Sequence, residues 1–189
     1  MIDLVIIVVI IIFLALVFDF TNGFHDSANA IATVVSTKVL TPRQAVGFAA
    51  FFNFIAAFGF GVAVAGTISK IIHLKIVATD LIPFIVLGGL IGAISWNIIT
   101  WYLGLPTSSS HALIGGVMGS GISAAGFSVI KYETVELAAI FMFVSPIIGL
   151  ICGFLFMVVI LWVCRRSSKS KVDRYFKKLQ LFSAGIYSF

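Results

Sequence analysis

Two carboxylates, two amides and an imidazole occur close together in "DFTNGFHDSANAIAT" (residues 19–33), directly after a run of Ile, Val, Leu and Phe. Ionisable groups at membrane depth are costly and are usually functional. Asp26 and Asn29 are three residues apart and share a helical face, and Asn22 and Thr33 lie on or near that face if the helix is continuous. These oxygen ligands favour a small cation, and hydrogen bonding between packed helices is the simpler alternative.

Four hydroxyl side chains follow a proline in "PTSSSHA" (residues 106–112). The proline ends one helix, and Thr107 or Ser108 can cap the next. A helix N-terminus offers unpaired N–H groups and a positive dipole end, both of which suit an anion. The stretch therefore predicts an anion site, with a capped helix start at the membrane surface as the alternative. The candidate anion ligands are Thr107, Ser108, Ser109 and Ser110.

Three further side chains are candidates for modulating binding at the sites in these two stretches. They are Asp19, His25 and His111. Asp19 precedes Asn22 by about one helical turn. His111 follows the hydroxyl run directly, but a single histidine is more often simply hydrogen-bonded. His25 has no role that the residues alone identify.

The composition identifies the kind of protein that holds these residues. The chain has 189 residues, of which 61% are hydrophobic and only 10% are charged, whereas soluble domains are about 45–50% apolar and about 25% charged. Long apolar runs indicate membrane helices rather than a barrel. We therefore expect an all-α polytopic membrane protein with about five membrane helices, including broken or re-entrant segments.

The predicted helices cover residues 3–37, 42 to about 69, 81–105, 107–126 and 135–164. The first has 35 residues, about 52 Å at 1.5 Å per residue, which is too long for one span of about 30 Å. We expect either a span plus a half-helix or a steeply tilted, broken helix, with Gly23 as the break point. Pro146 predicts a kink in the last helix. Residues 92–126 either cross the membrane or form a re-entrant hairpin with its tip at Pro106–His111. Close helix packing is expected at Gly88, Gly89, Gly92, Gly115, Gly116, Gly119 and Gly121.

Seven of the twelve Lys and Arg residues lie in "RRSSKSKVDRYFKK" (residues 165–178). A basic run after an apolar helix predicts a cytoplasmic segment, with anionic lipid binding as a lesser alternative. Nucleic acid is not an expected partner, because interleaved stacking aromatics are missing from this short run. The apolar residues after it are expected to begin another helix.

Two signatures resemble those of the inorganic phosphate transporter family PiT. "GFHDSANAIAT" (residues 23–33) is similar to the family motif G-x-N/H-D-x-A-N, and "GLPTSSSHALIGG" (residues 104–116) is similar to P-x-S-S/T-S/T-H. The resemblance covers the chain but only half of a family member, because family proteins consist of two inverted repeats. It implies a membrane repeat over residues 1–164, a basic cytoplasmic linker over 165–178 and the start of a second repeat over 179–189. The missing repeat, or a second chain, is an implied partner.

The resemblance implies symport of inorganic phosphate with Na⁺ or H⁺ across the cell membrane, without a further cofactor and without enzyme activity. Asp26 is not expected to contact phosphate directly, because two anions repel strongly at low dielectric. The expected cation ligands are Asp26, Asn22, Asn29 and Thr33, with Asp26 and Asn22 foremost if the ion is Na⁺. The expected phosphate ligands are Thr107, Ser108, Ser109, Ser110 and Asn29.

Other functions are compatible with parts of the sequence. A transporter or channel for another oxyanion such as sulfate would use the same chemistry. An intramembrane hydrolase is disfavoured, because the side chains of Ser110 and His111 diverge on a helix and no G-x-S-x-G context surrounds the serine. The oxygen-rich first stretch favours Na⁺ as coupling ion, and His25 and His111 leave H⁺ open.

Overall fold

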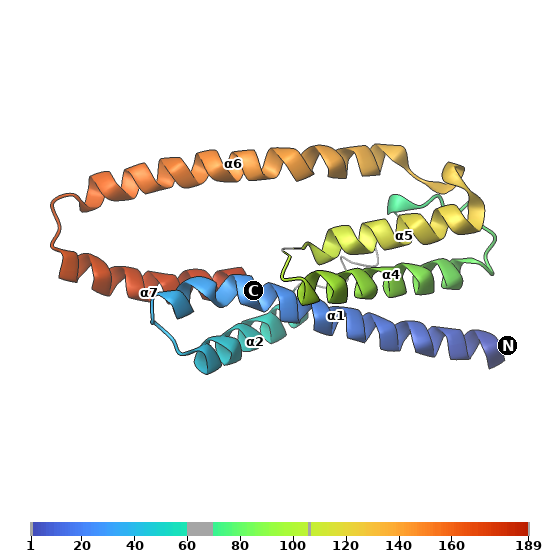
Figure 1. The fold of residues 1–189 in the computed structure, drawn as a ribbon, viewed down its shortest axis with the longest axis horizontal. Helices are drawn as coiled ribbons and strands as arrows, with labels where there is room; N and C mark the ends of the chain where they lie inside the picture. Colours follow the sequence, from blue (N-terminus) through green and yellow to red (C-terminus); the bar gives the residue numbers. More distant parts are fainter. Residues whose placement is uncertain (1, 60–69, 106, 189) are drawn as a thin grey trace. The chain divides into compact units, whose positions relative to one another are not determined.

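The computed structural model describes residues 2–59, 70–105 and 107–188. Every named element in these ranges is a helix, as the composition predicted (Figure 1). The elements are α1 (Ile2–Ser36), α2 (Pro42–Gly59), α4 (Ile82–Tyr102), α5 (Ser109–Ala125), the short 3-10 helix η1 (Phe127–Val129), α6 (Tyr132–Cys164) and α7 (Lys169–Ser188). The predicted continuation of the second helix to Ser69 and the predicted helix stop at Pro106 lie outside the described residues.

Three described helices are long and apolar enough to cross a membrane. They are the part of α1 from Leu4 to Ser36, all of α4 and all of α6. Helix α5 has 17 residues and is therefore about 25 Å long, slightly shorter than a typical hydrocarbon core. The number of crossings, and the choice between a crossing and a hairpin for residues 92–126, stay predictions.

Helix α1 corrects one expectation. It is a single helix of 35 residues that continues through Gly23, so the predicted break at this glycine is wrong. A glycine inside a helix costs only about 1 kcal/mol relative to alanine. A break in an apolar medium would leave several backbone groups without hydrogen bonds, which is the greater cost.

The start of α2 is capped by a contact between Thr41 and Gln44. Pro42 is its first residue, where a missing N–H costs nothing. The side-chain oxygen of Gln44 accepts hydrogen bonds from the backbone N–H of Thr41 at 3.1 Å and from the Thr41 hydroxyl at 2.9 Å. This is the reciprocal half of a capping box, and it fixes the point at which the chain re-enters a helix after α1.

The chain divides into two compact units. The first comprises Met1–Asn29 and Gly59–Thr134, and the second comprises Ala30–Phe58 and Val135–Phe189. In the first unit, α4 and α5 lie side by side (Figure 1). A methyl group added to Gly116 would collide with the backbone oxygen of Gly89, and one added to Gly89 would come within 2.7 Å of Val117. The predicted close packing of these glycines is therefore confirmed.

Not every predicted glycine contact is present. Gly88 and Gly92 face α5 closely, at 3.0 Å and 3.4 Å from Ser120 and Gly116 for an added methyl group. Gly121 would meet Ile72 at 2.9 Å. An added methyl group at Gly115 or Gly119 would meet no neighbouring atom within 4 Å. One side of α5 thus packs on α4, while its other glycines are open in the described structure.

The segment expected to be a loop, residues 127–134, is more ordered than predicted. It contains η1, and Ile130 forms an antiparallel bridge with Ile72. Both isoleucines are buried, together with Val129. Helix α6 then begins at Tyr132 rather than near Val135. The apolar side chains in "FSVIKYET" supply the burial that stabilises this turn of backbone.

In the second unit, α7 begins at Lys169 and includes most of the basic segment. Its C-terminal half packs on the end of α1 and on α2, with Val34, Ala45 and Ala184 forming a buried cluster. The Thr37 hydroxyl donates a hydrogen bond to the side chain of Gln180 at 2.9 Å. The predicted helix after residue 178 is thus present, but it begins about ten residues earlier.

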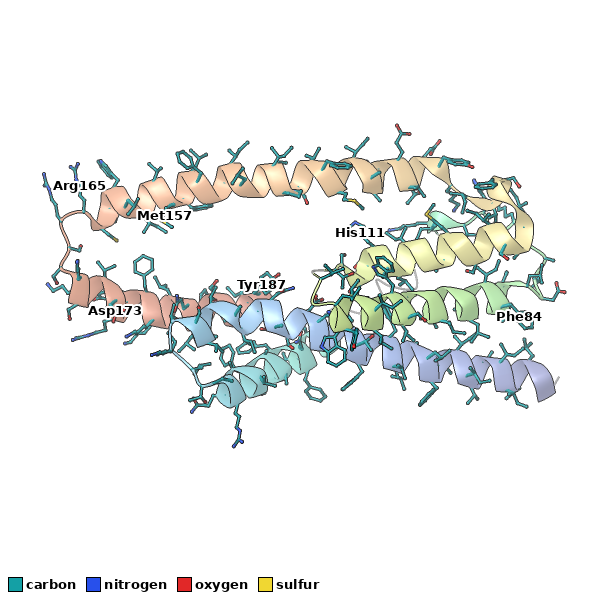
Figure 2. All side chains as sticks on the ribbon, viewed as in Figure 1. Phe84, His111, Met157, Arg165, Asp173 and Tyr187 are labelled. Carbon is teal, nitrogen blue, oxygen red and sulfur yellow. The ribbon has the colours of Figure 1, made fainter. Side chains whose placement is uncertain are left out.

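Helix α6 has a different environment. It runs through Pro146 as one continuous helix, and none of its described residues is buried. Its apolar side chains, Met157 among them, project from the helix along its whole length (Figure 2). This helix therefore contributes a long apolar surface rather than a packed interface within the described chain.

Candidate functional site

The hydroxyl run begins helix α5. Ser108 is the N-cap, with extended backbone angles of φ −111° and ψ 115°, and its side chain accepts a hydrogen bond from the backbone N–H of His111 at 3.4 Å. Of the two caps that the sequence allowed, the structure has Ser108. The remaining N–H groups of the first turn and the positive dipole end are then available to a ligand.

Ser109 connects the two polar stretches. It is 8% exposed, and its hydroxyl donates a hydrogen bond to Oδ1 of Asn22. These residues are 87 positions apart in the sequence, and they come from the stretch predicted to bind a cation and the stretch predicted to bind an anion. Both lie in the first compact unit. The two polar stretches are therefore in contact at this pair.

The other predicted ligands do not join this contact. Asp26 and Asn29 lie one and two turns beyond Asn22 on α1, and both are exposed. Thr33 is also exposed and belongs to the second unit. In the second stretch Ser110 is exposed and Thr107 is half-buried. Among the predicted ligands, the described structure therefore brings Asn22 and Ser109 into contact. Most of the other predicted oxygen ligands are exposed on its surface.

The candidate tuning residues differ from one another. Asp19 is exposed, and His111 is exposed on the first turn of α5 (Figure 2). His25 is half-buried, and its Nε2 lies 3.0 Å from the backbone oxygen of Asn97 on α4. Because a carbonyl oxygen can only accept, Nε2 carries the proton in this hydrogen bond. The contact joins α1 to α4 beside the Asn22–Ser109 pair, a role that the sequence did not reveal.

Two buried polar residues of α4 were not predicted as site residues. Thr100 is 3% exposed, and its hydroxyl bonds to the backbone oxygens of Trp96 at 2.9 Å and Asn97 at 3.0 Å. Asn97 is fully buried, and neither atom of its amide group has a hydrogen-bond partner among the described residues. The available signal was an amide and a hydroxyl three positions apart in "WNIITW" (residues 96–101), whose other residues are apolar.

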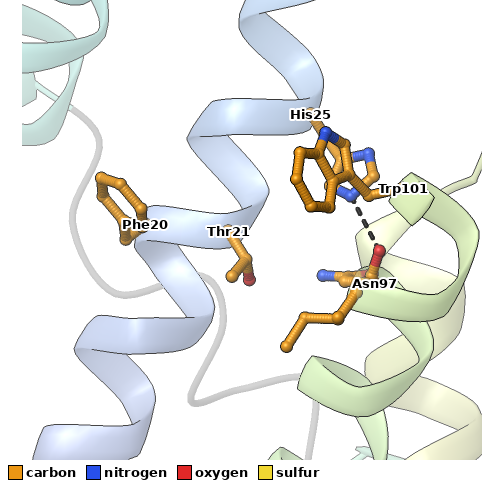
Figure 3. A pocket seen from close by; sticks show the side chains of 6 residues that line it. Phe20, Thr21, His25, Asn97 and Trp101 are labelled. Atoms are coloured by element: carbon orange, nitrogen blue, oxygen red, sulfur yellow. Dashed lines mark hydrogen bonds between the residues drawn. The ribbon is translucent and has the colours of Figure 1, made fainter.

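A cavity lies between α1 and α4 at this level. It has a volume of about 350 Å³, and Figure 3 shows the side chains that surround it. Its lining residues are Phe20, Thr21, His25, Asn97, Ile98 and Trp101. No cluster of three or more His, Cys, Asp or Glu side chains occurs in the described parts of the chain. The candidate ligands are thus neutral oxygen atoms together with the single carboxylate of Asp26.

The comparison with known families decides the assignment. The sequence profile of a family described as "Phosphate transporter family" matches residues 22–184, a range that contains both polar stretches. The chain belongs to this family. The resemblance found in the two motifs is therefore confirmed. The family is described as one of transporters, which agrees with the expectation that the protein is not an enzyme.

Individual relatives agree with the family. A "Probable low-affinity inorganic phosphate transporter" of Rhizobium meliloti is 47% identical over 92% of this chain and 51% of its own length. Proteins with the same description from Bacillus subtilis and Streptomyces halstedii are 41% and 46% identical, over 98% and 94% of this chain and over 55% and 82% of their own lengths. A solved structure described as "The sodium-dependent phosphate transporter" has a TM-score of 0.78 at 25% identity, covering 96% of this chain and 55% of that one. This chain thus spans about half the length of the first two relatives.

Proposed function

We propose that the protein takes part in cation-coupled symport of inorganic phosphate across the cell membrane. The observation that carries this proposal is the hydrogen bond from Ser109 to Asn22, which joins the two polar stretches at the N-terminus of α5. Transporter sites of this kind place a helix N-terminus at the anion and neighbouring oxygen atoms at the cation. The descriptions of the family and of its relatives support phosphate as the substrate.

In this proposal the first turn of α5 binds the phosphate. The backbone N–H groups of this turn, that of Ser109 among them, and the hydroxyls of Thr107, Ser108 and Ser110 donate to its oxygens. The side-chain oxygen of Asn29 on α1 can accept from the proton that hydrogen phosphate still carries at neutral pH. Sulfate has no such proton at that pH, so this acceptor oxygen disfavours the alternative oxyanion.

Asp26, Asn22, Asn29 and Thr33 hold the coupling cation in this proposal. The carboxylate of Asp26 attracts the positive charge, which offsets the repulsion between this carboxylate and phosphate. We propose Na⁺ as the ion, and the description of the similar solved transporter as sodium-dependent supports this choice. Because Asp26 and Asn29 are exposed and polar groups at membrane depth need partners, a second repeat or second chain covers them in the working transporter.

The basic residues 165–178 lie on the cytoplasmic side.

Uptake of labelled phosphate into proteoliposomes tests the proposal. An inward Na⁺ gradient at fixed pH is expected to drive uptake, and unlabelled arsenate is expected to compete much better than sulfate. Asp26→Asn is expected to reduce the Na⁺-driven uptake to background, because the charge that attracts the cation is lost. Asp80→Asn is the matched control, since Asp80 is an exposed carboxylate outside both stretches. Undiminished uptake in the Asp26 variant, or equal competition by sulfate, would contradict the proposal.

A further inference from the structure

A pocket lies at the corner where α6 ends and α7 begins. Its volume is about 440 Å³, which is within the range of small-molecule sites, about 300–1,000 Å³. Both helices belong to the second compact unit, and Figure 2 shows Arg165 at the end of α6 and Asp173 on the first turns of α7. The lining combines basic with apolar side chains, among them Arg165, Lys169, Leu161, Val172 and Phe176.

The basic residues of this pocket have no acidic partner within the described chain. The carboxylate in the lining, that of Asp173, is paired with Lys177, with Oδ2 and Nζ 2.8 Å apart. No carboxylate of the described residues lies within ion-pair distance of Arg165 or Lys169. The guanidinium of Arg165 stacks over the ring of Trp162, with its central carbon 5.2 Å from the ring centroid. Stacking uses the flat face of the guanidinium, so its N–H groups stay available to the oxygens of an anion.

The apolar part of the pocket continues apolar surfaces of both helices. On α6, Leu161 is 62% exposed, like the other unburied apolar side chains of this helix. On α7, Gln180 and Ala184 lie on the face that packs against the end of α1 and against α2. Val172 and Phe176 continue this face at four-residue spacing and are half-buried. The apolar face of α7 thus extends past its contact with α1 and α2 and into a pocket beside a membrane helix.

We propose that this pocket binds the headgroup of an anionic phospholipid, with the lipid phosphate at Arg165 and Lys169 and the acyl chains along α6. An amphiphile matches the lining, whereas a free anion would leave the apolar side chains without a partner. Tryptophan is enriched at the membrane–water interface, so Trp162 places the pocket at headgroup depth. Anionic lipid is concentrated in the cytoplasmic leaflet, the side on which residues 165–178 are proposed to lie. The inference does not depend on which solute the protein transports.

The test measures the dissociation constant of single lipids by native mass spectrometry of the detergent-solubilised protein. Dioleoylphosphatidylglycerol is the anionic probe, and dioleoylphosphatidylcholine is the zwitterionic one. The double variant Arg165→Gln/Lys169→Gln removes two positive charges from the pocket. The matched control, Arg174→Gln/Lys178→Gln, removes two positive charges from exposed residues of the same basic run that do not line the pocket. A further titration adds inorganic phosphate, with the ionic strength held constant by chloride.

We expect the wild type to bind phosphatidylglycerol more tightly than phosphatidylcholine, without displacement by inorganic phosphate. The pocket variant should bind phosphatidylglycerol about 30-fold more weakly, because each basic residue at a lipid headgroup contributes about fivefold. The control variant should stay within about threefold of the wild type, since charges away from the headgroup are screened. The variant Arg165→Lys/Lys169→Arg keeps both charges and should also stay within about threefold.

Four results would overturn the inference. Equal losses in the pocket and control variants would show that the basic run attracts lipid through its overall charge rather than through the pocket. Equal affinity for the two lipids would show that the pocket does not recognise the charge. Displacement by inorganic phosphate would identify a site for a free anion. Loss of binding in the charge-preserving variant would show that the two positive charges are not what binds, and this variant decides the matter if the pocket variant melts at a lower temperature without lipid.

Discussion

Helices α4 and α6 are both long and apolar enough to cross a membrane, yet they differ in how many of their residues are buried. Seven residues of α4 are buried, among them Gly89, Asn97 and Thr100, whereas α6 has no buried residue in the described chain. Apolar content alone therefore does not tell which helix packs inside a membrane protein. Lipid is as apolar as leucine, so helices associate where small residues allow close approach and where polar groups can pair.

The same contrast explains where the candidate site lies. The close approach of Gly89 and Gly116 holds α5 against α4 without large side chains between them. The N-terminus of α5 is thereby placed where Ser109 reaches Asn22. Helix α6 has neither a comparable glycine contact nor buried polar groups in the described structure, and none of the candidate ligands lies on it.

The largest expected effect comes from filling the α4–α5 contact. Gly116→Ala places a methyl group against the backbone oxygen of Gly89, which cannot move aside as a side chain would. We expect the free energy of unfolding to fall by about 3 kcal/mol, at the upper end for overpacking. Gly119→Ala is the control, since its methyl group would meet no neighbour, and it should be neutral or stabilising by up to about 1 kcal/mol. Equal effects of the two variants, measured by thermal unfolding in detergent, would contradict the packing.

A smaller effect is expected from removing buried volume. Leu90 on α4 is 6% exposed, and Leu150 on α6 is 75% exposed. Leu90→Ala should lower the free energy of unfolding by about 2 kcal/mol, the low end for such a cavity, because lipid rather than water surrounds the helices. Leu150→Ala should change it by less than about 0.5 kcal/mol. A cost at Leu150 as large as that at Leu90, in the same thermal unfolding measurement, would show that α6 is packed after all.

The sequence predicted the helical class, the cap at the start of α5 and the glycine contacts of α4. These features depend on local chemistry or on residue size, which a sequence displays directly. The sequence also pointed to Asn22 and Ser109 as candidate ligands from separate stretches, although only the structure shows that they are hydrogen-bonded to each other.

The remaining features depend on distant parts of the chain. Gly23 looked like a break because glycine weakens helices, but the hydrogen-bonding requirement of an apolar medium outweighs this local preference. The role of His25 depends on the backbone oxygen of Asn97, and a backbone atom has no signature in a sequence. Asn97 itself was overlooked because one amide in an apolar helix is ordinary until its burial and lack of partners are known.

The central claim is that the two polar stretches form one site, and the binding of phosphate to single and double variants tests it most directly. The dissociation constant for phosphate is measured in Na⁺ buffer for the wild type, Asn22→Ala, Ser109→Ala and the double variant, with the exposed Ser123→Ala of α5 as control. Each single change at the site should weaken binding about tenfold, or about 1.4 kcal/mol. Because the two residues act as a pair, the double variant should be scarcely weaker than either single one. A loss of about a hundredfold in the double variant, the product of two independent effects, would contradict the account.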